Sequence, residues 1–424
     1  MSGAPGFEPA PDQSTPVTGR PPVWMVNSRT AAPSCCSVSC HSSLLPVAVM
    51  ACILNSSGRP ECPPARPSGS RTPPPDRPGA AGESASVTLQ FGLRVPTVGT
   101  PADTAAYAAR VEAAGFDFMW VPDTPLLAGR WRDVYMHLGA AAERTERMRL
   151  GPGVTNPLTR HPLTTASAIA TLDDASGGRA DLVAGTGYSS AYIIGRKAAT
   201  LADMREATAL WRGLLGGQPT DPGGSETVLD RPNADLPIVL AATGPRMLAL
   251  AGEIADGVLL HVGAAPEAVA WALERVEAGM AAAGRAREEV RRIVVVTACI
   301  DDDRGRAIAH MRPCAAGLCR HRNAAVFFPG IEIPPRPADY AEPYPDLGHA
   351  VDWEEAKRVT AYVPAAAVEA CVALGSADEV AERARALAAL DIDAIWWRDE
   401  ATWTRPDRLM ERLAGEVLPR LRAG

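Results

Sequence analysis

The residues that could take part in chemistry occur in short clusters of glycine and small polar side chains. Each cluster follows a short apolar run of the kind that forms a buried strand. They contain no paired carboxylates, no serine–histidine–aspartate arrangement and no His-x-His pair for a metal. Such a set indicates a site for a cofactor that brings its own reactivity. The clusters are Asp123, then Gly153, Val154, Thr155 and Asn156, then Gly185, Thr186 and Gly187, then Ala242, Thr243 and Gly244, and finally Val262 and Gly263.

The tightest cluster ends a strand bounded by glycines. The sequence Ser176-Gly177-Gly178 predicts the end of a helix, because glycine permits the left-handed backbone that closes helices. The apolar run Ala180–Ala184 then predicts a buried parallel strand, which ends in Gly185-Thr186-Gly187. Two glycines there leave bare backbone that a flat ring or an anion can approach. An ordinary tight turn without a ligand is the alternative.

A second cluster has the features of an anion site. Thr243-Gly244-Pro245 lies where a helix is expected to begin, and Pro245 suits the first helical position. Free backbone N–H groups and the helix dipole attract anions at such a place. Another glycine turn, at Gly263, follows the next strand, as barrel phosphate sites often require. An ordinary strand-to-helix turn is again the alternative.

Strand and helix patterns alternate along the chain from about residue 88. Eight strand patterns, each followed by a helix pattern, predict an α/β fold, a (β/α)8 TIM barrel. A doubly wound open sheet would also alternate, but eight repeats and a closing helix favour the barrel. Asp103, Asp133, Pro162 and Thr200 are expected at helix starts, and Tyr188–Lys197 is expected to be irregular. The expected strands are Thr88–Leu93, Phe116–Val121, Met148–Val154, Ala180–Ala184, Pro237–Ala242, Val258–Leu260, Ile293–Ile300 and Ile392–Trp397.

Two stretches depart from this pattern. Residues 1–87 are crowded with Pro, Ser, Gly and Thr and lack apolar periodicity, so we expect a disordered N-terminal extension or an over-long gene start. The apolar run Leu44–Leu54 is too short to span a bilayer, although it could belong to a signal peptide. The barrel domain is expected over 88–424, with an insertion around 312–360 that is rich in proline from Phe328 to Tyr344.

Composition excludes several classes of protein. A net charge of -7 argues against a nucleic-acid surface, and nothing indicates a membrane protein. Four cysteines after residue 87 form no Cys-x-x-Cys pair, which is typical of buried thiols in a reducing cytoplasm. His321 lies near Cys314 and Cys319, but no second ligand pair completes a cluster, so no metal is expected.

Five sequence segments carry a resemblance to a known family. The chain resembles the luciferase-like superfamily of flavin- and coenzyme-F420-dependent oxidoreductases, above all the branch of F420-dependent methylenetetrahydromethanopterin reductase. The segments span nearly all of the chain after residue 87. Together they are specific for the superfamily, but they say little about which substrate is used. They are EAAGFDFMWVPD (112–123), LGPGVTNPLTRHP (150–162), LDDASGGRADLVAGTGYS (172–189), LPIVLAATGPRMLALAGEIADGVLL (236–260) and GSADEVAERARALAALDIDAIWW (375–397).

The resemblance implies roles for the strand-end residues. Gly153 and Val154 match a bulge that in many members is a non-prolyl cis peptide behind the cofactor ring. Thr155 and Asn156 would flank the ring, and Gly185 to Gly187 would pass beside it or its ribityl chain. Asp123 matches an acidic position near the polar edge of the ring. The cofactor phosphate would be held by Ala242, Thr243 and Gly244 together with Val262 and Gly263.

Two departures leave the general acid unassigned. Several members have a histidine where this chain has Thr124, and some have an acidic residue where it has Tyr188. His161 is the nearest replacement on the strand-three loop and a candidate catalytic residue beside Asp123. A histidine before proline at a helix start is more often structural.

The resemblance implies an F420- or FMN-dependent oxidoreductase that transfers a hydride between the reduced cofactor and a small organic substrate. One alternative is a two-component FMN monooxygenase that inserts oxygen and relies on a flavin reductase partner. The other is a non-catalytic flavin-binding protein, against which the eight strand patterns argue. A homodimer in the cytoplasm is expected by analogy.

Overall fold

A parallel β-barrel forms the centre of the fold. The structure is a computed structural model that describes residues 89–221, 223–400 and 402–422, so the predictions for 1–87 lie outside it. The strands follow the order β3-β2-β1-β9-β7-β6-β5-β4, and β8 pairs with β7 off this path. Bridges from Leu150 to Ala180 and from Thr155 to Ala184 bring β3 to β4, so the eight-stranded ring is nearly closed. The predicted TIM barrel is confirmed.

The strands all run parallel, and apart from the ten-residue β7 they are three to five residues long. They are β1 (Gln90–Arg94), β2 (Phe118–Val121), β3 (Arg149–Pro152), β4 (Leu182–Ala184), β5 (Ile238–Ala242), β6 (Gly257–Leu260), β7 (Arg291–Ile300), β8 (Val372–Gly375) and β9 (Ala394–Arg398).

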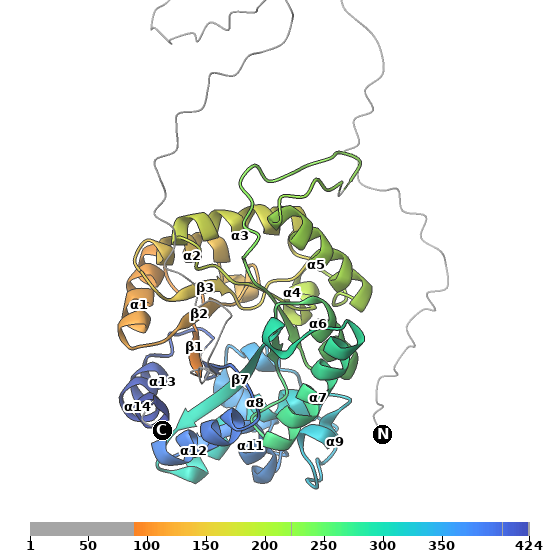
Figure 1. Cartoon of the computed structure of the whole chain (residues 1–424). Coiled ribbons are helices and arrows are strands. Elements are labelled where there is room, and N and C mark those ends of the chain that lie inside the picture. The colour runs from red at the N-terminus through yellow and green to blue at the C-terminus, as the bar shows by residue number, and fades with distance from the viewer. Residues whose placement is uncertain (1–88, 222, 401, 423–424) are drawn as a thin grey trace, which may run out of the picture. The chain divides into compact units, whose positions relative to one another are not determined.

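Helices surround the barrel, and Figure 1 shows α1, α2, α3, α5, α6, α7 and α12 around the strands. No helix in the described ranges is long and apolar enough to cross a membrane. The helices are α1 (Pro101–Ala113), α2 (Val134–Ala142), α3 (Pro162–Ser176), α4 (Tyr188–Ile193), α5 (Leu201–Leu215), α6 (Pro245–Ile254), α7 (Pro266–Ala282), α8 (Arg304–Cys319), α9 (Ala324–Phe327), α10 (Trp353–Val359), α11 (Ala365–Cys371), α12 (Ala377–Ala388), α13 (Asp407–Arg412) and α14 (Leu418–Arg422).

Side-chain caps set the helix ends close to the predicted positions. Asp133 and Thr200 are N-caps, as predicted, and Gly177 ends α3 with a left-handed φ of 70°. The prediction for Asp103 was wrong by three residues, because Thr100 is the N-cap of α1. Asp103 instead completes a capping box, in which its carboxylate accepts from the Thr100 N–H at 2.9 Å.

Two elements differ from the sequence-based expectations. Strand β8 was not expected, because Val372–Gly375 follows α11 directly, without a turn residue to separate helix from strand. It pairs with Thr297–Ile300 of the long strand β7, and β9 is the strand that was expected as the eighth. The segment expected to be irregular, Tyr188–Lys197, begins with the short helix α4.

Alternation along the strands separates the interior of the barrel from the layer beneath the helices. One buried cluster fills the barrel, with Val154 and Ala241 packed against it. In β6, for example, Leu259 belongs to this cluster, whereas Val258 and Leu260 belong to the cluster under the helices. The interior members are Phe118, Trp120, Val183, Val239, Leu259, Ile293, Val295, Ala394 and Trp396.

Candidate functional site

The carboxyl ends of the barrel strands meet at one opening, which we call the mouth. The last inward-facing residue of a strand must point into it, two positions beyond a side chain of the interior cluster. Arg398 follows Trp396 in this way, and His261 follows Leu259. The His261 N–H donates to the Ala242 carbonyl at 3.0 Å, which continues the sheet pairing by one residue. A histidine therefore faces the mouth from the end of β6, and an arginine faces it from the end of β9.

A cis peptide bond joins Gly153 to Val154 at the end of β3, as the resemblance implied. A Cβ on Gly153 would lie 2.6 Å from Cβ of Trp120 and 3.0 Å from the Trp396 ring. A Cβ on Gly185 would lie 3.1 Å from the Val154 side chain. Gly153, Val154 and Gly185 thus form a closely packed floor on one side of the mouth, where a side chain at Gly153 would collide with Trp120 and one at Gly185 would press on Val154.

Asn156 organises the loop that follows this floor. Its side chain is fully buried, and its Nδ2 donates to the hydroxyls of Thr159 and Ser190, both at 3.0 Å. Its Oδ1 accepts from the N–H groups of Leu158 and Thr159, at 2.9 and 3.0 Å. Gly187, with φ of 77°, packs against it so closely that a Cβ would lie 2.8 Å from the amide carbon. All four hydrogen-bonding positions of Asn156 are therefore used within the protein.

Asp123 lies in a buried charged network beside the mouth. Its carboxylate is buried and accepts from the Thr155 hydroxyl at 2.8 Å, while Arg160 Nε lies 3.5 Å away. Arg160 also pairs with Asp133 and stacks 5.0 Å from the Tyr135 ring centroid. Burial raises the pKa of Asp123, and Arg160 and Thr155 oppose that rise without cancelling it. The network fixes the position of Thr155, and it holds the carboxylate away from solvent.

His161 caps α3 and is exposed. Its Nδ1 accepts a hydrogen bond from the Leu163 N–H at 3.2 Å. That capping contact is the structural role considered for it from the sequence, and it leaves Nε2 available.

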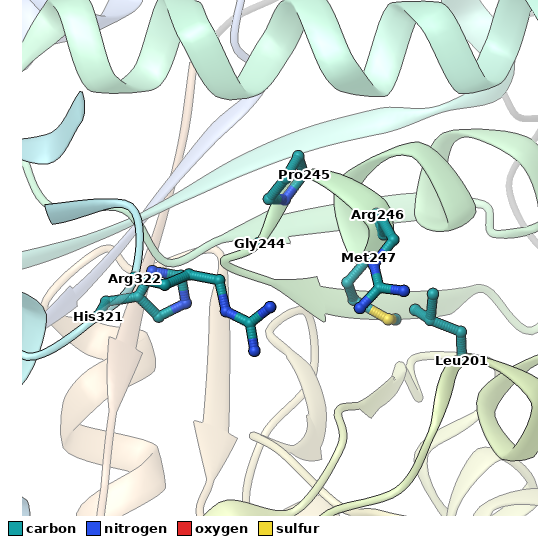
Figure 2. Close-up of a pocket in the computed structure, with 7 residues that line it drawn as sticks. All are labelled: Leu201, Gly244, Pro245, Arg246, Met247, His321 and Arg322. Atoms are coloured by element: carbon teal, nitrogen blue, oxygen red, sulfur yellow. The ribbon is translucent and has the colours of Figure 1, made fainter. Parts of the chain in front are cut away.

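A cavity of about 210 Å³ lies at the start of α6 (Figure 2). Gly244 is the N-cap of α6, and a Cβ on it would meet nothing within 4 Å. The guanidinium groups of Arg246 and Arg322 extend into the space beside Gly244 (Figure 2). Free helix N–H groups and two cations make this cavity suited to an anion. Its lining consists of Leu201, Gly244, Pro245, Arg246, Met247, His321 and Arg322.

The other residues expected at the phosphate lie around this cavity without lining it. Ala242 is buried and Thr243 half-buried at the end of β5. Val262 is fully buried in the layer beneath the helices, so its side chain packs the core. Gly263 has φ of 87°, and a Cβ on it would lie 3.0 Å from Cβ of Cys371. Of the five residues, the structure brings only Gly244 to the cavity wall.

The sequence-based expectations did not include the arginines and the histidine of the mouth and of the α6 cavity. Arg94, His261 and Arg398 each stand two positions after an inward-facing residue, so strand alternation alone could have identified them. Arg246 lies in the first turn of α6, directly after the recognised turn Thr243-Gly244-Pro245, and could have been found from its place at that helix start. Arg322 comes from the insertion, whose path back to the mouth has no sequence signal.

His321 was considered for a metal, and the described residues contain no cluster of three or more potential metal ligands.

Comparisons with known proteins agree with this architecture. The luciferase-like monooxygenase family matches residues 80–394. A 5,10-methylenetetrahydromethanopterin reductase of Archaeoglobus fulgidus is 36% identical over 210 residues, which cover 47% of this chain and 61% of that protein. An F420-dependent glucose-6-phosphate dehydrogenase of Nakamurella multipartita is 32% identical over 283 residues, which cover 62% of this chain and 78% of that protein.

A solved structure shares the fold. The coenzyme F420-dependent tetrahydromethanopterin reductase of Methanopyrus kandleri superposes with a TM-score of 0.63 and 26% identity. The superposition covers 78% of this chain and 99% of that one. The chain thus contains the whole barrel of that reductase, whereas its sequence match to the Archaeoglobus reductase spans less than two thirds of that protein's length.

Proposed function

Because the chain belongs to the luciferase-like monooxygenase family, as its match over residues 80–394 establishes, we propose that it is an F420-dependent oxidoreductase. It transfers a hydride between the reduced deazaflavin and a small organic substrate. The two relatives named above support this choice of cofactor. One is an F420-dependent dehydrogenase, and the other is a methylenetetrahydromethanopterin reductase, whose name resembles that of the F420-dependent tetrahydromethanopterin reductase of known structure.

The cavity at the start of α6 is the observation that carries the proposal. An anionic group of the cofactor could bind there to the N-terminus of α6, to Arg246 and to Arg322. A Cβ on Gly244 would meet nothing within 4 Å, so such a group can come close to the backbone. Both arginines are exposed, so they suit a long anionic chain better than one enclosed phosphate. F420 carries such a chain, with a phosphate followed by carboxylates, whereas FMN ends in its phosphate. The residues present therefore fit F420.

The protein contributes binding, orientation and exclusion of water. Gly153, Val154 and Gly185 would hold the ring, and Gly244 with the two arginines would hold the anionic chain. The bound deazaflavin would supply the hydride-carrying carbon. We propose that Asp123 positions Thr155 at the ring, because its carboxylate is buried and already bonded.

The prediction that His161 acts as an acid can be tested separately. The substitution His161→Asn keeps an oxygen that can cap α3, so the fold should be preserved. A fall in turnover without a change in stability would support the acid role. Unchanged turnover would leave His161 as a cap only.

Cofactor binding by the full chain tests the proposal. F420 and FMN would be titrated in parallel and followed by quenching of their fluorescence. We expect tight F420 binding and weak FMN binding, and a loss of F420 affinity of about 5- to 50-fold in Arg322→Gln and in Arg246→Gln, since each removes one charge contact. Arg144→Gln, which removes an exposed arginine just beyond the far end of α2, is the matched control and should bind F420 normally.

The opposite results have a clear meaning. Tight FMN binding with an absolute requirement for O₂ would replace the proposal with a two-component monooxygenase and its flavin reductase. Binding of neither cofactor would exclude the α6 cavity as a phosphate site. A homodimer belongs to the same proposal and is checked by the mass of the purified protein in solution.

A further inference from the structure

Two polar side chains, a histidine and an arginine, face the mouth opposite the glycine floor. His261 follows β6 and is exposed to the mouth, and Arg398 ends β9 and is half-buried. Protein atoms crowd the His261 ring although part of it is open to the mouth, and this desolvation is the main reason that its pKa falls to about 4; the charges of Arg398 and His321 lower it in the same direction. The imidazole of His261 is therefore neutral at physiological pH and can donate one hydrogen bond beside a permanent charge.

A second arginine lies beside this pair. Arg94, at the end of β1, is 6% exposed, and its guanidinium carbon lies 5.8 Å from the Trp131 ring centroid. Burial, with a smaller contribution from Arg398, lowers the pKa of Arg94 to about 9, although Asp399 opposes the change. Two guanidinium groups thus lie near each other in a partly desolvated place, where an added anion would relieve their repulsion.

The acidic groups of the mouth have their own partners. Asp123 is held by Thr155 and Arg160 on the other side. Glu400 Oε1 lies 2.7 Å from Nε2 of His310. The carboxylate of Asp399 acts on Arg94, whose pKa it raises. Within residues 89–221, 223–400 and 402–422, the hydrogen bond that Arg398 donates is a long one, from Nε to the Asp399 carbonyl at 3.5 Å.

We propose that Arg398 and His261 form a substrate subsite that binds an anionic oxygen group, a carboxylate or a phosphate, with Arg94 reinforcing the charge. Arg398 supplies the charge and His261 one neutral N–H donor. This inference rests on the proposed function. If the cofactor ring lies at Gly153 and Gly185, the subsite holds the anionic end of the substrate on the opposite side of the mouth.

The imidazole of His261 offers a direct probe. The full chain, without cofactor, would be labelled with ¹⁵N in its 7 histidines, and the His261 signals would be assigned by their absence in His261→Asn. Inorganic phosphate and acetate would then be titrated at several pH values. We expect a bound anion to raise the pKa of His261 by about one pH unit, because it offsets the field of Arg398. The stronger of the two responses identifies the group.

Matched variants separate this subsite from the α6 cavity. Arg398→Gln should abolish the response to added anion, Arg398→Lys should restore most of it, and Arg322→Gln should leave it intact. The proposal is overturned if neither anion moves the His261 titration in the wild type. It is also overturned if the response survives in Arg398→Gln and disappears in Arg322→Gln, since the anion would then occupy the cofactor cavity.

The two proposals fail in different ways. The His261 titration needs no cofactor, so a failure to bind F420 leaves the subsite result standing. If the chain binds F420 but neither anion changes the titration of His261, the proposed function stands and the proposal of an anionic substrate is refuted.

Discussion

On the β3–β4 side of the mouth a Cβ added to either glycine would press on its neighbours, whereas on the β6–β9 side a histidine and an arginine stand in accessible space. Gly153 and Gly185 are surrounded at 2.6 to 3.1 Å by Trp120, Trp396 and Val154 if a Cβ is added. His261 is exposed, and the hydrogen bond of Arg398 seen in the part of the chain that the structure describes is 3.5 Å long.

On the glycine side, close packing within the protein constrains the residue types, whereas on the other side the residues are suited to binding a ligand. On the glycine side each residue is determined by its neighbours in the protein, and substitution should cost stability first. On the cationic side the neighbours determine little, so substitution should cost ligand binding first. Stability and binding measured on the same variants can therefore confirm or refute the distinction.

Asn156→Ala should give the largest effect. The alanine removes four hydrogen bonds from a fully buried position and leaves the Leu158 and Thr159 N–H groups without their acceptor. We expect a loss of about 2–4 kcal/mol in the free energy of unfolding, measured with urea. Asn323→Ala is the control, because the buried Nδ2 of Asn323 has no partner within the described residues, and it should cost below about 1 kcal/mol. Equal losses in both variants would contradict the role assigned to Asn156.

Gly153→Ala should be the next largest. The added Cβ would lie 2.6 Å from Cβ of Trp120, which is close to the backbone and cannot swing away. We expect a loss of about 1–3 kcal/mol, together with weaker F420 binding. Gly139→Ala, in α2, meets nothing within 4 Å and should be neutral or slightly stabilising. A Gly153→Ala variant as stable as the wild type would show that Trp120 and the floor residues can shift to accommodate a side chain, which would contradict the close packing proposed for this side.

Glu400→Gln tests an ion pair at the cationic side, and its effect should depend on pH. The hydrogen bond to Glu400 raises the pKa of His310 above its ordinary 6.5. The stability gained from protonated His310 is therefore complete below pH 6.5 and is lost as the pH rises through the folded-state pKa. We expect Glu400→Gln to cost up to about 1 kcal/mol at pH 6 and less at pH 9, since both side chains are partly exposed.

Urea denaturation at both pH values measures this effect. Glu382→Gln, an exposed change on α12, should show no such pH dependence. A cost that grows from pH 6 to pH 9 would mean that His310 is not protonated by this contact.

The helix ends could be predicted from the sequence because their physical cause is local. Gly177 ends α3 and Pro245 begins α6, and such residues carry their own conformational signal. The barrel also follows from strand and helix periodicity. Strand β8 could not be predicted, since Val372–Gly375 continues an apolar helix and is a strand only because β7 extends far enough to pair with it.

The cationic side was missed for a different reason. Arg398 and His261 match no catalytic pattern, and an isolated arginine in a sequence is usually a solvated one. Only the register of the inward-facing residues brings them to one opening. Arg322 depends on the path of a long insertion, which tertiary contacts determine.

The smallest effect on stability should come from Arg398→Gln. Its guanidinium contributes one 3.5 Å contact to the protein and lowers the pKa of Arg94, so removing it relieves repulsion as much as it removes attraction. We expect the free energy of unfolding to change by less than about 0.5 kcal/mol. If urea denaturation instead shows a loss comparable to that of Asn156→Ala, Arg398 is part of the framework and the two sides of the mouth are built alike. A stable variant that no longer responds to added anion would show that this charge is kept for a ligand, because the fold does not need it.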